Sequence, residues 1–392
     1  MGLRESAGGV QGSVRNLDEA LAELASILDF CPAVERRGMR VHEIQGVTSV
    51  TIHRPLERLA LNPARQLNPW VTLAEFPWLM AGRSDVGWLL PYLPRAADYA
   101  DDGRYWRAGY GPRLRSWGRQ YFGSPLGEVD QVAKVVAMLQ GDPFTRQAVI
   151  SIWDPAVDLG AKTKDMPCTN WLHFQVREVG GRRLLDLTVV MRSNDVLWGF
   201  SGVNVVNFTL LLELVAMLSG LDMGVYRHVS TNMHVYEKHL ERMGPISAGP
   251  EIYGLMRGGG YPAFGGSGLM GEPVSLPVFT YECRKVLGML ESVRSAGPVK
   301  ISSEVQWLSD WAYFMSLHTA YSAGGASAEW WAEALQEVRN GSWRIAAARA
   351  VAARDDRFAA ILGEVLRPLL GHEGADTYLK AFHPQGRADA EG

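Results

Sequence analysis

The chain reads DQVAKVVAMLQGDPFTRQAVISIWDP over residues 130–155. Asp130 precedes apolar positions at helical spacing, and Gly141 begins a Gly-Asp-Pro run that ends them, so a capped helix is predicted here. Residues 148–153 are β-rich and predict a strand. Arg146 stands between the two elements. This stretch therefore predicts an α/β unit in which an arginine is held between a helix and a strand.

Further predicted elements flank this unit. Residues 204–218 are nearly all apolar and long enough for a buried helix, whereas residues 1–15 are expected to form a loose leader. Residues 92–118 are rich in aromatic residues, Arg and Gly, which is typical of an ordered loop that lines a polar pocket. The remaining predicted elements are strands at residues 47–52, 173–176 and 184–191 and helices at residues 72–79 and 16–30, the second with Asn16 as its expected N-cap.

The overall composition narrows the class of protein. The chain has 392 residues, of which 47% are hydrophobic and 21% are charged, as in ordinary globular proteins. A formal net charge of −3 supplies no basic field that would attract nucleic acid or an anionic membrane. No uninterrupted apolar run of about 18 residues predicts a transmembrane helix, and residues 1–14 lack the apolar core of a secretory signal. We therefore expect small-molecule partners and a cytoplasmic location.

The chain changes character towards its C-terminus. Residues 245–277 are rich in Gly and Pro, and residues 304–379 have a helical pattern rich in Ala, Trp and Leu. This change predicts a main domain over residues 1–295 and a helical extension over residues 296–392. The expected fold class is α/β (α+β), with a mixed or antiparallel sheet, surrounding helices and a C-terminal helical extension.

Three cysteines, Cys31, Cys168 and Cys283, are too few and too far apart for a disulfide framework or a zinc site, so no metal site is expected. A lone cysteine is more often a buried and inert side chain than a reactive one. Arg146 and Arg192, however, bracket Cys168 in the sequence and adjoin β-rich runs. An arginine near a thiol stabilises the thiolate and can also bind a phosphate. Cys168 is therefore the candidate nucleophile.

A second motif, NMHVY, occupies residues 232–236. His234 and Tyr236 lie two positions apart on an extended segment, so they face the same side and can both donate to a hydroxyl group. The alternative interpretation is a histidine of the core whose hydrogen bonds are satisfied, and this is the commoner role for such a residue taken alone.

The order of these motifs resembles the thymidylate synthase family. The resemblance covers roughly residues 35–239, and its order and spacing together are specific although no single motif is. The matching pieces are AEFPWLMAGRSD around Glu75, Tyr110-Gly111, the stretch 130–155, Pro167-Cys168, RSND at 192–195 and HVY at 234–236.

The resemblance implies catalytic roles for several residues. Cys168 would add to carbon 6 of a pyrimidine nucleotide, and Glu75 would organise water and proton transfer at the base. Tyr110 would line the same site. Asp195 would hold the pterin of the cofactor, 5,10-methylenetetrahydrofolate, and Trp106 is a further expected cofactor-binding residue. A thiolate suits this chemistry because it both attacks and leaves well, while the reduced folate supplies the one-carbon unit.

The resemblance also implies how a pyrimidine nucleoside monophosphate is bound. Arg146 matches an arginine that the family donates from the opposite subunit, which implies a homodimer. Arg36 matches a mobile phosphate arginine, with Arg37 nearly as plausible. The other implied substrate-binding residues are Arg192 and Ser193 for the phosphate, Asn204 for the base, and His234 and Tyr236 for the sugar.

The chain departs from ordinary thymidylate synthases in four places. Thr169 replaces a His beside the nucleophile, and Gln147 replaces a second phosphate arginine. The segment 199–204 is one residue longer than in the family, and the C-terminal closing tail has no match. RSNDVLWG at 192–199 resembles the divergent phage and antibiotic-pathway branch, whose members often hydroxymethylate their substrate.

We therefore expect a folate-dependent pyrimidine nucleoside monophosphate 5-hydroxymethylase. Because an amide at Asn204 suits uracil, dUMP is favoured, while dCMP and CMP remain open. The alternative is a thymidylate synthase that methylates dUMP on the same scaffold. A less favoured alternative is a non-catalytic nucleotide-binding relative.

Overall fold

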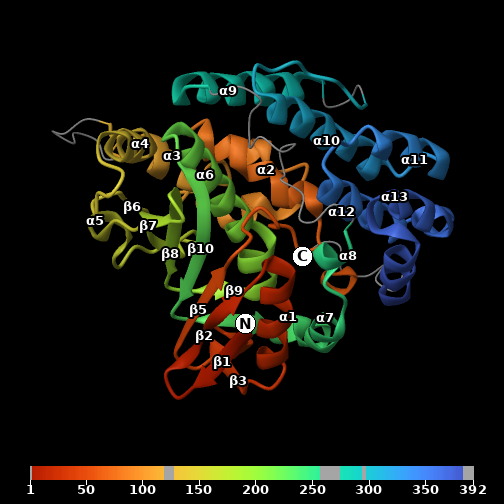
Figure 1. Cartoon of the computed structure of the whole chain (residues 1–392), viewed down its shortest axis with the longest axis horizontal. Coiled ribbons are helices and arrows are strands. Elements are labelled where there is room, and N and C mark those ends of the chain that lie inside the picture. Colours follow the sequence, from red (N-terminus) through yellow and green to blue (C-terminus); the bar gives the residue numbers. More distant parts are fainter. Residues whose placement is uncertain (1, 119–127, 257–273, 294–296, 383–392) are drawn as a thin grey trace.

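In the computed structural model, the described part of the chain comprises residues 2–118, 128–256, 274–293 and 297–382. Its larger sheet has the strand order β1-β2-β5-β10-β8-β7-β6 (Figure 1). The pairs β2–β5 and β10–β8 are parallel, and the other pairs are antiparallel. The predicted mixed sheet is thus confirmed. Its strands are β1 (Gly2–Ser6), β2 (Gly9–Val14), β5 (Val47–Ile52), β6 (Val149–Ser151), β7 (Thr169–Val179), β8 (Arg182–Met191) and β10 (Asp222–Ser230).

The prediction of a loose leader over residues 1–15 is wrong. Strands β1 and β2 form a hairpin whose second strand pairs in parallel with β5. Glycine permits this pairing, because a Cβ atom at Gly9 would lie 2.1 Å from the carbonyl oxygen of Val47. The glycines that gave the segment its loose appearance are the residues that let two backbones approach.

A smaller sheet brings together segments that are far apart in the sequence. Its strands are ordered β3-β4-β11-β9. In this sheet His234 pairs with Glu43 on one side and with Asp195 on the other. Two sequence motifs, RSND and HVY, therefore meet at neighbouring strands. The strands are β3 (Ala33–Arg36), β4 (Met39–Glu43), β9 (Asn194–Asp195) and β11 (Met233–Tyr236).

Helices cover the larger sheet, and two of them begin where the sequence predicts. Asn16 accepts a hydrogen bond from the Glu19 backbone, and Asp130 accepts one from Ala133, so both predicted caps are confirmed. The longer helices are α1 (Leu17–Leu28), α2 (Pro69–Met80), α4 (Gln131–Gly141) and α6 (Val205–Leu218). The shorter elements are η1 (Pro63–Arg65), η2 (Val86–Trp88), η3 (Pro94–Tyr99), α3 (Tyr110–Arg115), α5 (Pro155–Asp158), η4 (Val196–Asn204), η5 (Glu237–Arg242), α7 (Met243–Ala248) and α8 (Ile252–Leu255).

The consecutive helices η4 and α6 form the most apolar run. By length and composition alone, Val196–Leu218 could cross a membrane, but 83% of its most apolar window is buried inside the protein. Buried core helices also meet these criteria of length and composition, so this run is weak evidence for a membrane span. Here it packs between α2 and strand β8 and supplies the centre of the core.

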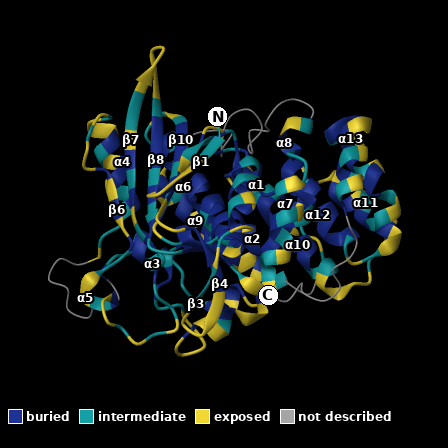
Figure 2. Ribbon diagram, turned by 90° about the horizontal axis from the view of Figure 1, so that it is seen from below, coloured by how far each residue is buried: buried dark blue, intermediate teal, exposed yellow. Residues whose placement is uncertain are grey.

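The C-terminal helices continue the same hydrophobic core (Figure 2). They pack against α2, whose Trp70 ring lies 5.7 Å from Phe314 and 4.3 Å from Tyr321. The predicted helical extension is present, while the proposed boundary between residues 295 and 296 and most of the Gly/Pro-rich segment lie outside the described residues. The helices are α9 (Leu276–Val293), α10 (Gln306–Ala323), α11 (Ala328–Gln336), α12 (Gly341–Ala352) and α13 (Asp356–Ala381), which is kinked at Gly371.

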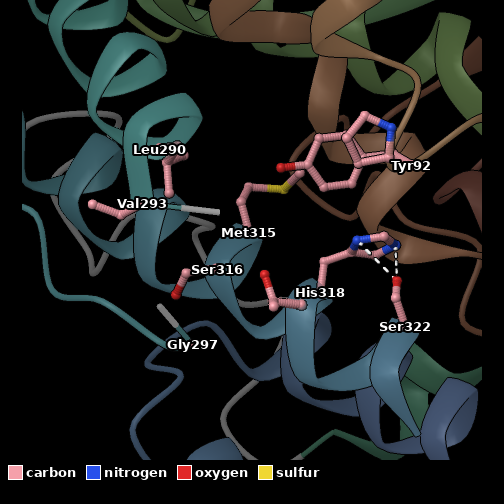
Figure 3. Close-up of a pocket in the computed structure, with 10 residues that line it drawn as sticks. Tyr92, Leu290, Val293, Gly297, Met315, Ser316, His318 and Ser322 are labelled. Atoms are coloured by element: carbon pink, nitrogen blue, oxygen red, sulfur yellow. Dashed lines mark hydrogen bonds between the residues drawn. The ribbon is translucent and has the colours of Figure 1, made fainter. Parts of the chain in front are cut away.

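A cavity of about 270 Å³ lies where these helices meet the rest of the protein (Figure 3). Tyr92 contributes from the sheet-bearing part, and Leu290, Met315 and His318 contribute from α9 and α10. The residues that line this cavity include none of the predicted site residues. The predicted site therefore lies elsewhere in the fold.

Candidate active site

Cys168 and Arg192 adjoin because their strands pair. Thr169 at the start of β7 pairs with Met191 at the end of β8, so the residue before one strand meets the residue after the other. The Arg192 backbone N–H donates to the Cys168 carbonyl at 2.9 Å. Its Nη2 lies 3.7 Å from the Cys168 Sγ, and its Nε donates to the Pro167 carbonyl at 2.8 Å. The guanidinium is therefore fixed beside the thiol by the backbone around it.

Opposing effects act on the Cys168 thiol. Burial raises the pKa of Cys168, and the Asp165 carboxylate adds to this effect, while the charges of Arg192 and Arg37 lower it. Because the net shift is upward, the thiol is the resting form at neutral pH. Arg192 is the group positioned to stabilise a thiolate when one forms.

Tyr110 joins the same site from the start of α3. Its hydroxyl accepts a hydrogen bond from the Thr169 backbone N–H at 3.1 Å, and its ring stacks on Phe208 at 6.2 Å. Burial raises the pKa of Tyr110, so its hydroxyl stays neutral and keeps a proton to donate. Thr169 is fully buried, and its side chain also interacts with the Tyr110 hydroxyl, which opposes the effect of burial on the pKa of that residue.

Glu75 lies on α2 and meets α6 across the core. Asn207 donates to the Glu75 carboxylate at 2.7 Å, and burial raises the pKa of Glu75 to about 7. A carboxyl group with such a pKa can both give and accept a proton near neutral pH. The sequence interpretation missed Asn207, although an amide within an otherwise apolar helix was the available signal.

Asp195, His234 and Tyr236 occupy the neighbouring strands β9 and β11. The His234 and Tyr236 rings meet edge to face at 5.4 Å, so the two side chains lie on one side as predicted. One Asp195 oxygen accepts from the Trp198 backbone N–H. The other oxygen and the Nδ1 of His234 are buried, and neither has a hydrogen-bond partner among the described residues. Burial is the main cause that raises the pKa of Tyr236, and the charges of Asp195 and Cys168 raise it further. Tyr236 is therefore close enough to respond to both this group and the thiol.

The predicted phosphate residues fall in different settings. Ser193 donates to Asn232 at 3.3 Å, and Asn232 in turn donates to Glu43 at 2.7 Å. Arg36, the predicted mobile arginine, forms an ion pair with Glu43 and so points to that carboxylate. The neighbouring Arg37, at the tip of the β3–β4 hairpin, is the arginine whose charge acts on Cys168. Of these two arginines, Arg37 is therefore the one whose charge reaches the thiol, and the phosphate role predicted for Arg36 stays a prediction.

The lengthened segment 199–204 is accommodated by a change in helix type. Residues of η4 form a π-helix, which takes up one more residue per turn than an α-helix does, so no residue has to loop out. Asn204 ends this element, and its side chain makes no capping hydrogen bond to α6. A Cβ atom at Gly199 would lie 3.1 Å from the Asn204 amide oxygen, which places that amide against the π-helix backbone.

The buried Arg65 is hydrogen-bonded to the π-helix. Arg65 donates to the Ser201 hydroxyl at 2.9 Å and to the Leu197 carbonyl at 2.6 Å. Burial lowers the pKa of Arg65 to about 9, and the Asp195 charge opposes that effect. Nothing in the sequence motifs singled out Arg65, because its partners lie more than 130 residues away.

Asp165 is a second residue that the sequence interpretation missed. Its carboxylate accepts from the Ala108 backbone N–H at 2.7 Å, and this bond ties the nucleophile segment to the loop of residues 92–118. Burial raises the pKa of Asp165 to about 6. The predicted ordered loop is thus anchored beside Cys168.

Trp106 and Arg146, the last two predicted site residues, lie outside the hydrogen-bonded group around Cys168. Trp106 packs edge to face on Trp78 at 5.7 Å, and its indole N–H donates to the Ala96 carbonyl at 2.8 Å. Arg146 is exposed in the connection between α4 and β6. In the parts of the chain that the structure describes, no group of three or more His, Cys, Asp or Glu residues could hold a metal ion.

Two features of the site suit a reduced folate. The unpartnered oxygen of Asp195 is a buried acceptor of the kind that an N–H-rich heterocycle satisfies. The adjoining η4 is apolar, and its Trp198 is exposed and so available for contact with a flat ring. The residues that are present therefore fit a pterin.

Comparisons with known proteins agree with this geometry. Residues 28–246, more than half of the chain, match the family model described as Thymidylate synthase. The chain is 37% identical over 235 residues to a protein of Pseudomonas phage M6 and 38% identical over 218 residues to one of Bacillus phage SP01. Both relatives are named deoxyuridylate hydroxymethyltransferase, as is a protein of Delftia phage PhiW-14 that is 30% identical over 199 residues. These matches cover 59%, 54% and 48% of this chain but only 63%, 55% and 51% of the three relatives.

Proposed function

The chain belongs to the thymidylate synthase family, and from this premise we propose that it is a deoxyuridylate 5-hydroxymethyltransferase. The observation that best supports this proposal is the position of Arg192 beside the thiol, with its Nη2 3.7 Å from the Sγ of Cys168. The names of the phage relatives support the choice of substrate and of reaction.

Cys168 is proposed as the nucleophile that adds to carbon 6 of the pyrimidine. Its thiol must lose a proton first, and the Arg192 charge favours that loss against burial. Addition turns carbon 5 into a nucleophile, and donors near the 4-oxo group then stabilise the charge that develops on oxygen. The Asn204 amide is proposed to accept from the ring N–H of uracil and to donate to its 4-oxo group.

A bound 5,10-methylenetetrahydrofolate would supply the one-carbon unit. Asp195 is proposed to hold its pterin through the oxygen that has no partner among the described residues. Trp106 lies on the loop that Asp165 anchors beside the thiol and is proposed as a further contact. The roles of both residues rest on the family resemblance and on these positions.

Water, rather than hydride, is proposed to complete the reaction. Glu75 has a pKa of about 7, so it can take a proton from a water molecule near neutral pH. The buried hydroxyl of Thr169, beside that of Tyr110, is proposed as a further group that binds a water molecule next to the nucleophile. A thymidylate synthase activity, in which hydride from the folate completes the same path, is the second candidate, and the family supports it.

A homodimer is proposed as the working form. Val149 on β6 and Trp171 on β7 are 47% and 39% exposed, which leaves apolar side chains uncovered at one edge of the larger sheet. Arg146 is exposed just before β6 and is proposed to reach a phosphate in the partner's site. Because free nucleotides and reduced folates are its proposed partners, we also propose that the protein acts in the cytoplasm.

Mass spectrometry of the nucleotide product tests this function. The purified protein is incubated with methylenetetrahydrofolate and separately with dUMP, dCMP, UMP and CMP. We expect dUMP to gain CH₂O, with no oxidation of the folate. A gain of CH₂ with stoichiometric dihydrofolate would identify a thymidylate synthase instead, and the absence of any product would reject both reactions.

A further inference from the structure

Helix α2 carries a proline two residues after Glu75. Pro77 has no backbone N–H, so it cannot donate to the carbonyl of Leu73, four residues earlier. In a helix interior the proline ring also crowds that carbonyl. The helix therefore needs another donor for a buried carbonyl close to the residue that is proposed to move protons.

A tryptophan of the C-terminal extension supplies that donor. The indole N–H of Trp311, on α10, donates to the Leu73 carbonyl at 2.8 Å. From the other side, the indole N–H of Trp88 donates to the carbonyl of Ala74 at 2.9 Å. The two carbonyls that precede Glu75 on the chain are thus each bound by a buried indole.

The environment of Trp311 fixes it in this role. The ring is fully buried and packs against Trp88 at 5.9 Å and against Trp307 at 6.4 Å. The indole N–H of Trp70, on α2, donates back to the carbonyl of Phe314, on α10, at 3.0 Å. Helices α2 and α10 are therefore joined by reciprocal hydrogen bonds, and a shift of α10 would displace the turn that bears Glu75.

We propose that Trp311 is a positioning residue for Glu75. Its N–H takes the place of the helical donor that Pro77 removes, and so the C-terminal extension sets the position of the proton-transfer group. This proposal rests on the function proposed above for Glu75. It also gives the extension a part in the reaction, although residues 297–382, the described part of the extension, contribute no side chain to the bonded groups around Cys168.

The pair of Trp311 and Pro77 offers a direct test. Trp311→Phe keeps an aromatic ring but removes the N–H, and we expect kcat to fall by about tenfold while the nucleotide KM changes by less than about twofold. Pro77→Ala restores a backbone N–H that can reach the Leu73 carbonyl, so the double variant should recover most of the lost kcat. Trp343→Phe is the matched control, because Trp343 packs in the same aromatic group against Trp307 and Phe314.

Unfolding of the same variants in urea gives a reading that does not depend on activity. A positive coupling between Trp311→Phe and Pro77→Ala in unfolding free energy would support the shared carbonyl. Equal loss of kcat in the single and double variants, or independent effects on unfolding, would overturn the proposal. If the wild-type protein makes no product, the proposed function fails, and the unfolding cycle then decides whether Trp311 replaces the missing donor.

Discussion

The two halves of the candidate site differ in what they are bonded to. In the thiol cluster, formed by Cys168, Arg192 and Tyr110, the polar groups are held by protein atoms, as in the bonds from Arg192 to Pro167 and from Thr169 to Tyr110. In the recognition cluster, formed by Asp195, His234 and Tyr236, one carboxylate oxygen and one ring nitrogen are buried without a partner in the described residues.

This difference suggests that the thiol cluster carries out the reaction and that the recognition cluster binds ligands. A reacting group works best when its surroundings are fixed in advance, because no reorganisation is then needed during the reaction. A buried polar atom without a partner costs about 1–3 kcal/mol, and a ligand that satisfies it recovers that free energy. Substitutions in the thiol cluster should therefore lower kcat, whereas those in the recognition cluster should mainly raise KM.

The largest expected effect comes from the thiol itself. Cys168→Ser should lower kcat by at least about 10⁴-fold, because a hydroxyl has no accessible anion at neutral pH. Nucleotide affinity, measured by calorimetry, should stay within a fewfold of the wild type. Cys31→Ser is the matched control, since the Cys31 thiol is half-buried and donates to the Ile27 carbonyl. Near-normal turnover of Cys168→Ser would reject the nucleophile and with it the contrast between the clusters.

Glu75→Gln should cost activity and add stability. We expect kcat to fall by about 10²–10⁴-fold, since Gln cannot transfer a proton, while the Asn207 hydrogen bond can persist. Burial raises the pKa of Glu75 from 4.5 to about 7, so the native state binds the proton more tightly than the unfolded state. The wild type therefore loses stability as pH rises through this window, by about 3 kcal/mol at most.

Urea unfolding at pH 5 and pH 8 checks the second part. The Gln variant should exceed the wild type in unfolding free energy at pH 8 and approach it at pH 5. Other buried carboxyl groups, such as Asp18 and Glu213, are common to both proteins and cancel in the difference. If the difference in unfolding free energy between the Gln variant and the wild type were the same at pH 5 and pH 8, the pKa of Glu75 would not be raised by folding.

Asp195→Asn isolates one oxygen of the recognition cluster. An amide oxygen can still accept from Trp198 and cap η4, while an N–H₂ replaces the unpartnered acceptor. The folate KM should rise by about 100-fold, with little change in nucleotide affinity. Steady-state kinetics with each substrate varied in turn measures both. A fall in kcat at an unchanged folate KM would show that Asp195 acts in the reaction itself and does not mainly bind the folate.

Local signals in the sequence predicted the parts of the molecule that short segments determine. Asn16 and Asp130 cap their helices because a cap needs only residues within one turn. The strand pairing of Gly9, the contact of Asn207 with Glu75 and the bond from Trp311 to Leu73 join segments that lie far apart, and no local pattern encodes them. The extra residue before Asn204 was visible in the sequence, but its uptake into a π-helix depends on packing around η4.

The smallest expected effect concerns Arg146, which belongs to neither cluster of its own protomer. Arg146 is exposed, so its loss should leave folding unchanged. If it binds the phosphate in the partner's site, Arg146→Ala should raise the nucleotide KM roughly tenfold. A mixture of Arg146→Ala and Cys168→Ala protomers should then regain activity, since one site of each hybrid dimer combines an intact Cys168 with an intact Arg146. Gln147→Ala is the matched control, because the neighbouring side chain is also exposed and carries no charge. Confirmed hybrid dimers that regain no activity would show that each protomer completes its own site.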